Sequence, residues 1–193
     1  MVGGGDPPFV EGRPLTRHAL EWARELHAGQ VREVDRAEFI LHPLEVAALL
    51  SGRGFDDEVV AAGLLHDAVE DTDVGIEDVR RRFGDRVAWI VAAVTEDPGL
   101  ADYRERKAAL RRAVEEAGLD AQAVYAADKV VKARELRAQA AHAARVLGEP
   151  DLRRRLEHYE LSLGMLESVA PDLPLVRQLA FELWALRTLP PQG

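Results

Sequence analysis

The sequence predicts a single all-α domain, and three observations lead to this prediction. Good helix formers, above all Ala, Leu, Glu and Arg, dominate the composition. No segment alternates apolar and polar residues for long enough to form a half-buried strand. A length of 193 residues suits one well-packed core, whereas two cores would be crowded. We therefore expect one helical bundle of about eight to nine helices.

Helix-start and helix-stop signals set the bounds of the first five expected helices. Thr16 can cap the first helix, and Gly29 ends it. Pro43 suits the first turn of the second helix, and Asp56 opens the third. Gly84 stops the fourth helix before the fifth begins. These signals place the five helices at residues 16–28, 43–52, 58–71, 76–83 and 86–94.

The same signals continue through the second half of the chain. Gly118 separates the sixth helix from a long seventh, which ends before Pro150. Pro171 and Pro174 separate the eighth helix from the ninth. The four expected helices cover residues 103–117, 120–147, 151–169 and 175–186. We expect the folded domain at residues 15–187, with a flexible head at 1–14 and a loose tail at 188–193.

Composition and charge narrow the classes of function. The chain has no Cys, so any metal must be held by His and carboxylates. A net charge of −9 argues against a nucleic-acid surface but leaves room for a small phosphorylated substrate at a local basic pocket. No apolar stretch approaches the ~20 residues of a membrane span, and the N-terminus lacks the pattern of a signal peptide. We therefore expect a cytoplasmic protein without membrane contact, and we leave a homo-oligomer open.

The third expected helix carries most of the chemistry, in the segment AAGLLHDAVED. Residues four apart share a helix face, which places His66 over Glu70 and Asp67 over Asp71. Burying four ionisable side chains in an otherwise apolar segment is costly unless a charge compensates them, and a divalent cation is the simplest compensation. The alternative is an exposed helix end with solvated carboxylates, because neighbouring residues on a helix point ~100° apart.

Two distant residues extend this set. His42 precedes Pro43 at a helix start, where a rigid turn can aim an imidazole, and Asp128 follows two alanines far downstream. Together with His66 and Asp67 they offer two imidazoles and two carboxylates. This mixed nitrogen and oxygen donor set suits Mn²⁺, Fe²⁺ or Zn²⁺ and leaves coordination positions open for water and a phosphate oxygen.

The motifs HP, LLHDAVEDT and AADK resemble the hydrolase domain of the Rel/SpoT alarmone enzymes and their small stand-alone relatives, the metazoan SpoT homologues. The resemblance extends through FGDRVAWIVAAVTE and ERK, and to His27 with Gln30, and covers about two-thirds of the chain, Arg17 to Leu136. It implies an HD-type helical fold. An HD pair alone indicates only the wider phosphohydrolase superfamily, whereas HD followed by ED is more specific.

The resemblance also implies a role for each matching residue. His42, His66, Asp67 and Asp128 match the family's metal ligands, usually of Mn²⁺. Glu70 and Asp71 match the acidic pair that orients or activates the attacking water. In the family, a metal-bound water removes the 3′-pyrophosphate of ppGpp and pppGpp. The physical logic agrees, because a metal lowers the pKa of bound water and a nearby carboxylate accepts its proton.

Two departures from the family concern the substrate. The family carries a basic pair in the loop before the first ligand, where this shorter loop has Val31, Arg32 and Glu33. The family usually has an Asn that contacts the ribose, and here Lys132 takes its place. We therefore expect the metal chemistry to be intact and the recognition of base and sugar to be altered.

The remaining basic residues have weaker claims. Those that we expect to contact the substrate are Arg32, Arg106, Lys107, Lys129 and Lys132. For them a solvated helix face is the alternative. We interpret Arg111 and the Arg run at 153–155 as solvated faces, and His158 as a surface or packing residue.

Three functions compete at this point. The leading hypothesis is metal-dependent hydrolysis of a phosphate or pyrophosphate ester on a nucleotide, resembling (p)ppGpp 3′-pyrophosphohydrolysis. The second is an HD-type nucleotidase or NADPH phosphatase. The third is a nucleotide-binding sensor without turnover, which the Glu70–Asp71 pair disfavours because a pure binder needs no carboxylate to activate water.

Overall fold

The computed structural model describes residues 5–32, 35–142 and 150–188. This part of the chain contains ten α-helices and one short 3-10 helix, and its β pairing is an isolated bridge between Val31 and Glu38. The all-α prediction is confirmed. The helices are α1 (Pro14–Leu26), α2 (Leu41–Gly52), α3 (Asp57–Leu65), α4 (Ala68–Asp71), α5 (Ile76–Phe83), α6 (Asp85–Val94), α7 (Tyr103–Ala117), α8 (Leu119–His142), α9 (Pro150–Val169) and α10 (Pro174–Thr188).

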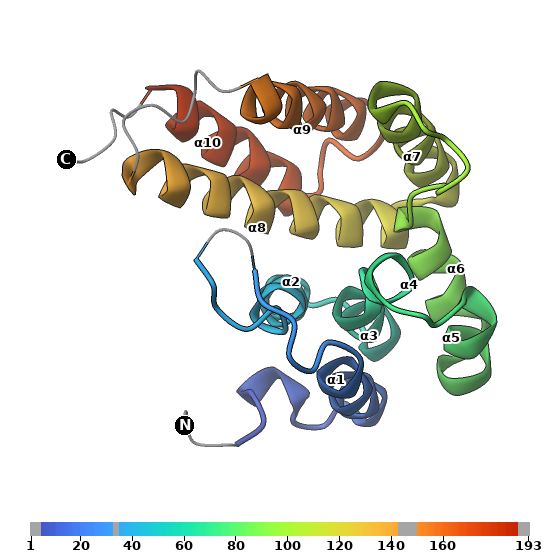
Figure 1. Cartoon of the computed structure of the whole chain (residues 1–193). Coiled ribbons are helices and arrows are strands. Elements are labelled where there is room, and N and C mark those ends of the chain that lie inside the picture. The colour runs from blue at the N-terminus through green and yellow to red at the C-terminus, as the bar shows by residue number, and fades with distance from the viewer. Residues whose placement is uncertain (1–4, 33–34, 143–149, 189–193) are drawn as a thin grey trace.

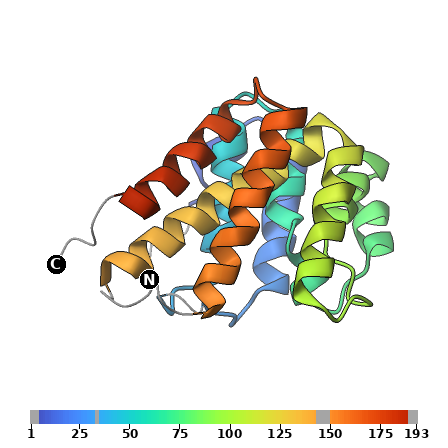
Figure 2. The ribbon, with the colours of Figure 1, turned by 90° about the horizontal axis from the view of Figure 1, so that it is seen from above.

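Helix α8 runs through the middle of the molecule, with α1 to α6 on one side and α7, α9 and α10 on the other (Figures 1 and 2). It contacts six other helices, namely α2, α3, α6, α7, α9 and α10. Small apolar residues such as Ala123, Ala126 and Ala127 are fully buried and let these neighbours approach closely. Any polar side chain in the middle of α8 is therefore forced into the interior.

The start of α1 differs from the sequence expectation. Thr16 does not cap the helix, which begins at Pro14. Instead the carboxylate of Asp57, at the start of α3, accepts hydrogen bonds from the backbone N–H groups of Leu15 and Thr16 at 3.0 and 2.8 Å. The hydroxyl of Thr16 also donates to this carboxylate, at 2.6 Å. A distant acidic side chain thus satisfies the free N–H groups of the first turn.

The chain before α1 was expected to be a flexible head. From Pro8 to Val10 it forms a 3-10 helix, and Val10 is buried in the core. At the other end, Thr188 closes α10, and residues 189–193 lie outside the described residues, as do residues 143–147 of the expected seventh helix. Among the described helices none is long and apolar enough to cross a membrane. The cytoplasmic location and any homo-oligomer stay predictions.

The third expected helix, residues 58–71, is two helices in the structure. Helix α3 ends at Leu65 and α4 begins at Ala68, so His66 and Asp67 form the joint. Asp67 has φ −92° and ψ −6°, at the edge of the right-handed helical region toward the bridge region. The Asp71 N–H donates to the Asp67 carbonyl at 2.9 Å, so Asp67 already belongs to the hydrogen-bonded first turn of α4. The two side chains of the joint thus lie where one helix ends and the next begins.

Close packing of α2 against α3 brings the two histidines near one another. A Cβ atom on Gly63 would lie only 2.5 Å from the Cδ1 atom of Leu50 on α2, so any larger residue here would require the Leu50 side chain to shift. His42 lies in the first turn of α2, and His66 lies three residues after Gly63. The small residue in α3 lets the two helices approach closely enough for their imidazoles to meet.

Candidate metal centre and catalytic cavity

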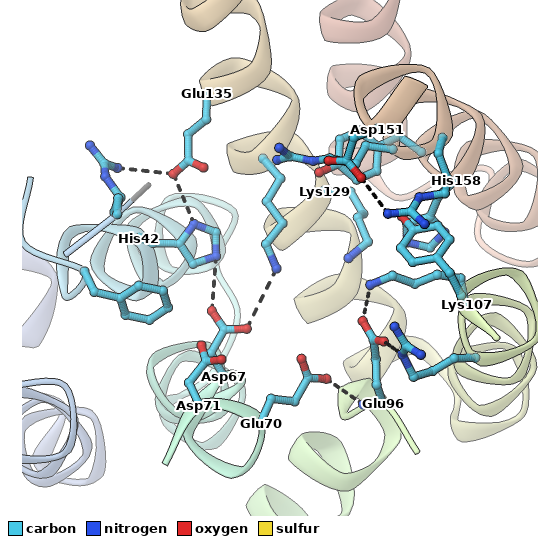
Figure 3. Close-up of a pocket in the computed structure, with 18 of the residues that line it drawn as sticks. His42, Asp67, Glu70, Asp71, Glu96, Lys107, Lys129, Glu135, Asp151 and His158 are labelled. Carbon is cyan, nitrogen blue, oxygen red and sulfur yellow. Dashed lines mark hydrogen bonds and ion pairs between the residues drawn. The ribbon is translucent and has the colours of Figure 1, made fainter. Parts of the chain in front are cut away.

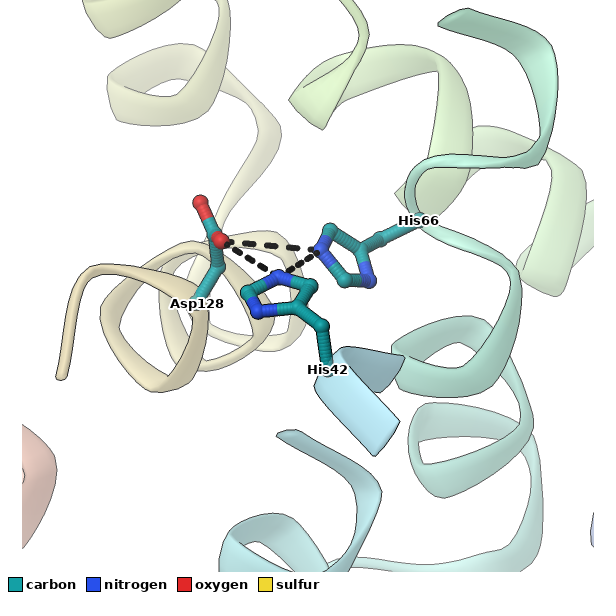
Figure 4. Close-up of side chains that lie close together, drawn as sticks. All are labelled: His42, His66 and Asp128. Carbon is teal, nitrogen blue, oxygen red and sulfur yellow. Dashed lines mark hydrogen bonds and ion pairs between the residues drawn. The ribbon is translucent and has the colours of Figure 1, made fainter. Parts of the chain in front are cut away.

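Three buried side chains from distant parts of the chain converge at α8. His42 comes from α2, His66 from the joint between α3 and α4, and Asp128 from α8 (Figure 4). The Nε2 atoms of the two histidines lie 3.2 Å apart, and Asp128 Oδ1 lies 3.1 Å from His42 Nε2 and 3.5 Å from His66 Nε2. The ligand atoms of all three residues fall within 4.8 Å of one another.

Asp67 completes the group that the sequence predicted. Its Oδ2 atom lies 3.1 Å from His66 Nε2 and 3.4 Å from His42 Nε2. On a regular helix the side chains of residues 66 and 67 would diverge by ~100°. Because the helix breaks at these two residues, both side chains point to the same centre.

The outer nitrogens of both imidazoles are already engaged. His66 Nδ1 donates to the Gly63 carbonyl at 2.9 Å, and His42 Nδ1 lies 3.4 Å from the Glu135 carboxylate. Each acceptor holds the ring hydrogen on Nδ1 and leaves the Nε2 lone pair facing inward. This arrangement is typical of metal-binding histidines, whose second nitrogen is bonded to a carboxylate or a carbonyl.

The charges at this centre fit a bound cation. Two Nε2 lone pairs and two carboxylate oxygens are all acceptors, so they repel one another unless a proton or a cation lies between them. Burial opposes a charged imidazolium, yet Asp67 and Asp128 raise the pKa of His66 to about 10. The pocket thus attracts positive charge strongly enough to protonate a buried histidine. Two imidazoles and two carboxylates are a donor set that a divalent transition metal satisfies.

A cavity of about 650 Å³ opens beside this centre. Figure 3 shows His42, Asp67 and Asp71 on one side of it and Glu96, Lys107 and His158 on the other. His66 and Asp128 do not belong to this lining, although both are buried and lie within 3.2 Å of His42 Nε2. The wall includes every residue predicted to act in catalysis or substrate binding, namely Arg32, Glu70, Asp71, Arg106, Lys107, Lys129 and Lys132.

The two predicted catalytic carboxylates reach the cavity from α4. Glu70 Oε1 accepts a hydrogen bond from the Glu96 N–H at 2.5 Å, which fixes the direction of its side chain. Both residues are exposed to solvent, but nearby protein atoms partly desolvate their carboxyls, and Asp67 adds a neighbouring negative charge. Desolvation and this charge raise the pKa of both Glu70 and Asp71 above their ordinary values. A carboxylate with a raised pKa is a better proton acceptor.

The lysines of α8 lie against the carboxylates of the predicted metal ligands. Lys129 Nζ donates to Asp128 Oδ2 at 2.5 Å, and Lys132 Nζ lies 2.9 Å from Asp128 Oδ1 and 3.8 Å from Asp67 Oδ1. Burial opposes the charge of both lysines, but Asp128 raises the pKa of each. Both therefore stay charged at neutral pH. Lys132 is the more exposed of the two and faces the cavity beside the predicted ligands.

The other predicted basic residues are held by carboxylates on the cavity wall. Arg106 and Lys107 both pair with Glu96, and the Arg106 guanidinium also donates to the carbonyl of Leu100 at 2.9 Å. Arg32 pairs with three carboxylates, at 2.5 to 3.4 Å: Asp35, Glu45 and Glu135. The Arg32 side chain is thus tied to the residue that orients His42.

Comparison with known proteins agrees with this geometry. The family model of the HD domain matches residues 19–149. The chain belongs to the HD domain family. A MESH1 guanosine-3′,5′-bis(diphosphate) 3′-pyrophosphohydrolase from Xenopus tropicalis is 36% identical over 126 residues, which cover 64% of this HD domain chain and 70% of that protein. The resemblance to the small stand-alone proteins is confirmed.

Two further relatives show how the lengths compare. A guanosine-3′,5′-bis(diphosphate) 3′-pyrophosphohydrolase from Aquifex aeolicus is 42% identical over 92 residues, but these are 48% of this chain and only 13% of that longer protein. The solved structure of a metazoan ortholog of SpoT that hydrolyzes ppGpp matches with a TM-score of 0.75 at 25% identity, over 96% of this chain and 99% of that chain. This HD domain therefore matches the short relatives over most of their length and the long ones over a small part.

Sequence reasoning missed the contribution of α9 to the cavity. Arg154 and Arg155, interpreted as part of a solvated face, line the cavity, as do His158 and Tyr159. Their spacing of about one helical turn was the available signal, since residues three and four apart share a face. Glu135 was also missed, although it lies two turns after Asp128 on the same helix. Nothing in the sequence alone indicates which helix α9 faces.

Proposed function

We propose that this HD domain hydrolyses the 3′-pyrophosphate of guanosine 3′,5′-bis(diphosphate), ppGpp, with the help of one divalent cation. The observation that carries the proposal is the convergence of two imidazoles and two carboxylates beside a cavity whose wall holds both carboxylates, such as Glu70 and Asp71, and cations, such as Lys107 and Lys132. The activities that the names of the MESH1 and SpoT relatives print support ppGpp as the substrate.

The residues that would hold the cation are His42, His66, Asp67 and Asp128. Their mixed donor set favours Mn²⁺, with Fe²⁺ and Zn²⁺ as alternatives that metal analysis distinguishes. Bound there, the cation supplies positive charge that acidifies water and neutralises phosphate oxygens. Glu135 and the Gly63 carbonyl keep the two imidazoles in the tautomer that this role needs.

Glu70 and Asp71 have the position and the proton affinity of general bases. In the reaction a water oxygen bonds to the phosphorus attached at O3′, and the bond from that phosphorus to O3′ breaks. The water proton passes to a carboxylate, for which the raised pKa of Glu70 and Asp71 is suited. The O3′ atom leaves with the bonding electron pair and takes a proton. The products are GDP and pyrophosphate.

Cations on the cavity wall offset the charge of the substrate. Lys132 and Lys129 lie nearest the metal-binding carboxylates, so we assign them to the pyrophosphate that is cleaved. Arg106 and Lys107 lie farther along the wall with Glu96, and we assign them to the rest of the nucleotide. Fixed cations at a phosphoryl group act on the charge of the transition state and need no rearrangement during the reaction.

A different nucleotide is the second candidate, and two observations favour it. Arg32, in the loop where the family carries a basic pair, has its guanidinium N–H groups engaged by three carboxylates. Lys132 likewise stands where the family usually has an Asn for the ribose, and is paired with Asp128. A site of this kind discriminates less among bases than among phosphate groups.

The test is a comparison of substrates with purified, metal-loaded protein. We expect release of pyrophosphate from ppGpp and pppGpp to exceed phosphate release from NADPH and from nucleoside monophosphates. NADPH as the better substrate would make the second candidate the function. Tight binding of all these nucleotides without any turnover would make the protein a sensor and would end the hydrolase proposal.

A further inference from the structure

A second, smaller cavity lies between α7 and α9, next to the catalytic cavity. Its volume is about 220 Å³, and we call it the side pocket. The two cavities share part of their walls, since Tyr103, Lys107, Arg154 and His158 line both. The two cavities are therefore direct neighbours, separated by these side chains. Figure 3 shows Lys107 and His158 on the side of the catalytic cavity away from His42 and Asp67.

The spacing of residues along both helices builds the side pocket. Tyr103, Lys107 and Arg111 lie four residues apart on α7 and so share one face. Arg154 and His158 are likewise four apart on α9, and these two faces meet. Two helical stripes thus bring aromatic and cationic side chains together.

The side pocket carries more positive than negative charge. Its lining includes the cations Arg104, Lys107, Arg111 and Arg154, against a single carboxylate, Glu157. That carboxylate is already paired with Arg104 at 3.0 Å. Lys107 and Arg154 have carboxylate partners outside the lining. Among the described residues, Arg111 has no carboxylate within ion-pair distance, which leaves a cation in the pocket without a counter-charge.

The contact of Arg111 with His158 leaves a second group unsatisfied. Arg111 Nη1 donates to His158 Nδ1 at 2.9 Å. A guanidinium only donates, so Nδ1 accepts and the ring hydrogen lies on Nε2. That Nε2 atom is buried and has no hydrogen-bond partner among the described residues, although His158 is only 3% exposed. Burial and the nearby Lys129 and Lys107 lower the pKa of His158 to about 2, which keeps the ring neutral.

An oxyanion in the side pocket supplies the negative charge that Arg111 lacks. The His158 Nε2 atom is closed to solvent, so its N–H reaches such an acceptor only when the side chains around it shift. Unsatisfied buried donors are rare, which favours such a contact. A phosphoryl group fits better than a carboxylate because it offers more acceptor oxygens to donors on two helices. The volume of the side pocket equals that of several water molecules, each of which occupies about 30 Å³ in the liquid. The side pocket therefore has room for a phosphoryl group.

We propose that the side pocket binds the 5′-diphosphate of the nucleotide while the 3′-pyrophosphate lies at the metal centre. This inference rests on the proposed function, because it takes a nucleotide phosphorylated on both sides of the ribose as the substrate. Arg111 and His158 then act as specificity residues that recognise the second phosphorylated end. The ligand spans the shared wall of the two cavities.

The test uses ligands that cannot be hydrolysed at the 3′ position. Calorimetry with the metal-loaded protein compares GDP, which carries the 5′-diphosphate alone, with guanosine. We expect GDP to bind at least tenfold more tightly, since charge-assisted hydrogen bonds are of about this strength. Arg111→Gln and His158→Leu should each remove most of the difference. His158→Gln, which keeps a donor near the Nε2 position, should restore part of it.

Matched controls come from adjacent arginines on the same helices. Arg112 and Arg153 are exposed and line neither cavity, so Arg112→Gln and Arg153→Gln should leave GDP binding unchanged. Equal binding of GDP and guanosine overturns the proposal, as does an equal loss of GDP binding in the controls. Inorganic phosphate that binds through Arg111 without competing with GDP also overturns it, because the pocket then serves a free anion.

The outcome is separable from that of the proposed function. If ppGpp is hydrolysed but Arg111 and His158 do not affect GDP binding, this inference alone fails. If ppGpp is not hydrolysed, yet GDP binds through these two residues, the site for a nucleotide diphosphate stands and the proposed reaction fails.

Discussion

The Nε2 atoms of His42 and His66 face each other at 3.2 Å, although 24 residues separate them in the chain. Both rings use Nδ1 for other contacts, so two lone pairs meet in the protein interior. Such a pair is unfavourable unless a shared positive charge lies between the rings. The stability of the fold and the binding of a cation should therefore be linked.

Metal removal should lower the thermal stability of the wild-type protein. At a metal concentration of about 100 times the dissociation constant, binding adds about 2.7 kcal/mol to the free energy of unfolding. For a chain of this size that corresponds to a fall in Tm of about 5–10 °C when a chelator is added. Calorimetry with and without chelator measures it. His66→Ala should show no metal-dependent shift, whereas His18→Ala, an exposed position, should keep it. An unchanged wild-type Tm, with metal loss verified, would contradict the proposed ligand set.

Catalysis should be separable from metal binding at α4. Glu70→Gln and Asp71→Asn remove a proton acceptor but keep side chains of similar shape, and Glu70→Gln retains an oxygen to accept the Glu96 N–H. We expect each variant to keep its metal and to lose about 100-fold or more in kcat, the usual scale for a positioned acid–base group. Turnover and metal content are measured on the same preparations. Asp73→Asn is the control, because Asp73 is exposed nearby and lines neither cavity.

The result can go against this assignment in two ways. Near-normal turnover in both variants would mean that these carboxylates are solvated charges without a role in the rate. Loss of metal in either variant would move that residue into the ligand shell. The double variant adds information, because two residues that act as a unit lose much less together than the sum of their separate losses.

Local patterns predicted much of this structure, and tertiary contacts decided the rest. Glycine and proline placed most helix ends within a few residues, and the four predicted ligands do lie together. The break at His66 and Asp67 was not predictable, because the apolar pattern continues across it and the reason for it is the centre formed with α2 and α8. Asp57 likewise caps α1, whose first turn lies 41 residues earlier in the chain. Which face of α9 meets α7 depends on packing that no local signal records.

Base recognition should be weaker than recognition of the phosphate groups. Arg32 is held by carboxylates and Lys132 is paired with Asp128, so the hydrogen-bond donors of both are already engaged away from the base. We expect kcat/KM for ppGpp to exceed that of its adenosine analogue by less than 1000-fold, which corresponds to about 4 kcal/mol. Steady-state kinetics on both nucleotides gives the ratio. A larger preference for guanine would show that another part of the cavity reads the base.

His158 should make the folded protein less stable in acid. Burial, followed by the charges of Lys129, Lys107 and Arg111, lowers its pKa to about 2, against an ordinary value of 6.5. Between these values the unfolded chain binds a proton at His158 and the folded chain does not. Above pH 6.5 His158 is neutral in both states, and its effect on the free energy of unfolding is constant. As the pH falls from 6.5 toward 2, protonation of the unfolded chain progressively lowers the free energy of unfolding. From pH 8 to pH 5 this one group should cost about 2 kcal/mol of unfolding free energy.

Denaturant unfolding of wild type and His158→Gln at pH 8 and pH 5 isolates this contribution. The substitution also removes a contact with Arg111, but that loss is the same at both pH values. The informative quantity is therefore the difference in the free energy of unfolding between the two proteins, and how this difference changes with pH. We expect the variant to lose about 2 kcal/mol less than wild type on acidification, and the control His18→Gln to behave like wild type. A gap that does not change with pH would mean that His158 accepts a proton within the fold, which a buried ring beside three cations should resist.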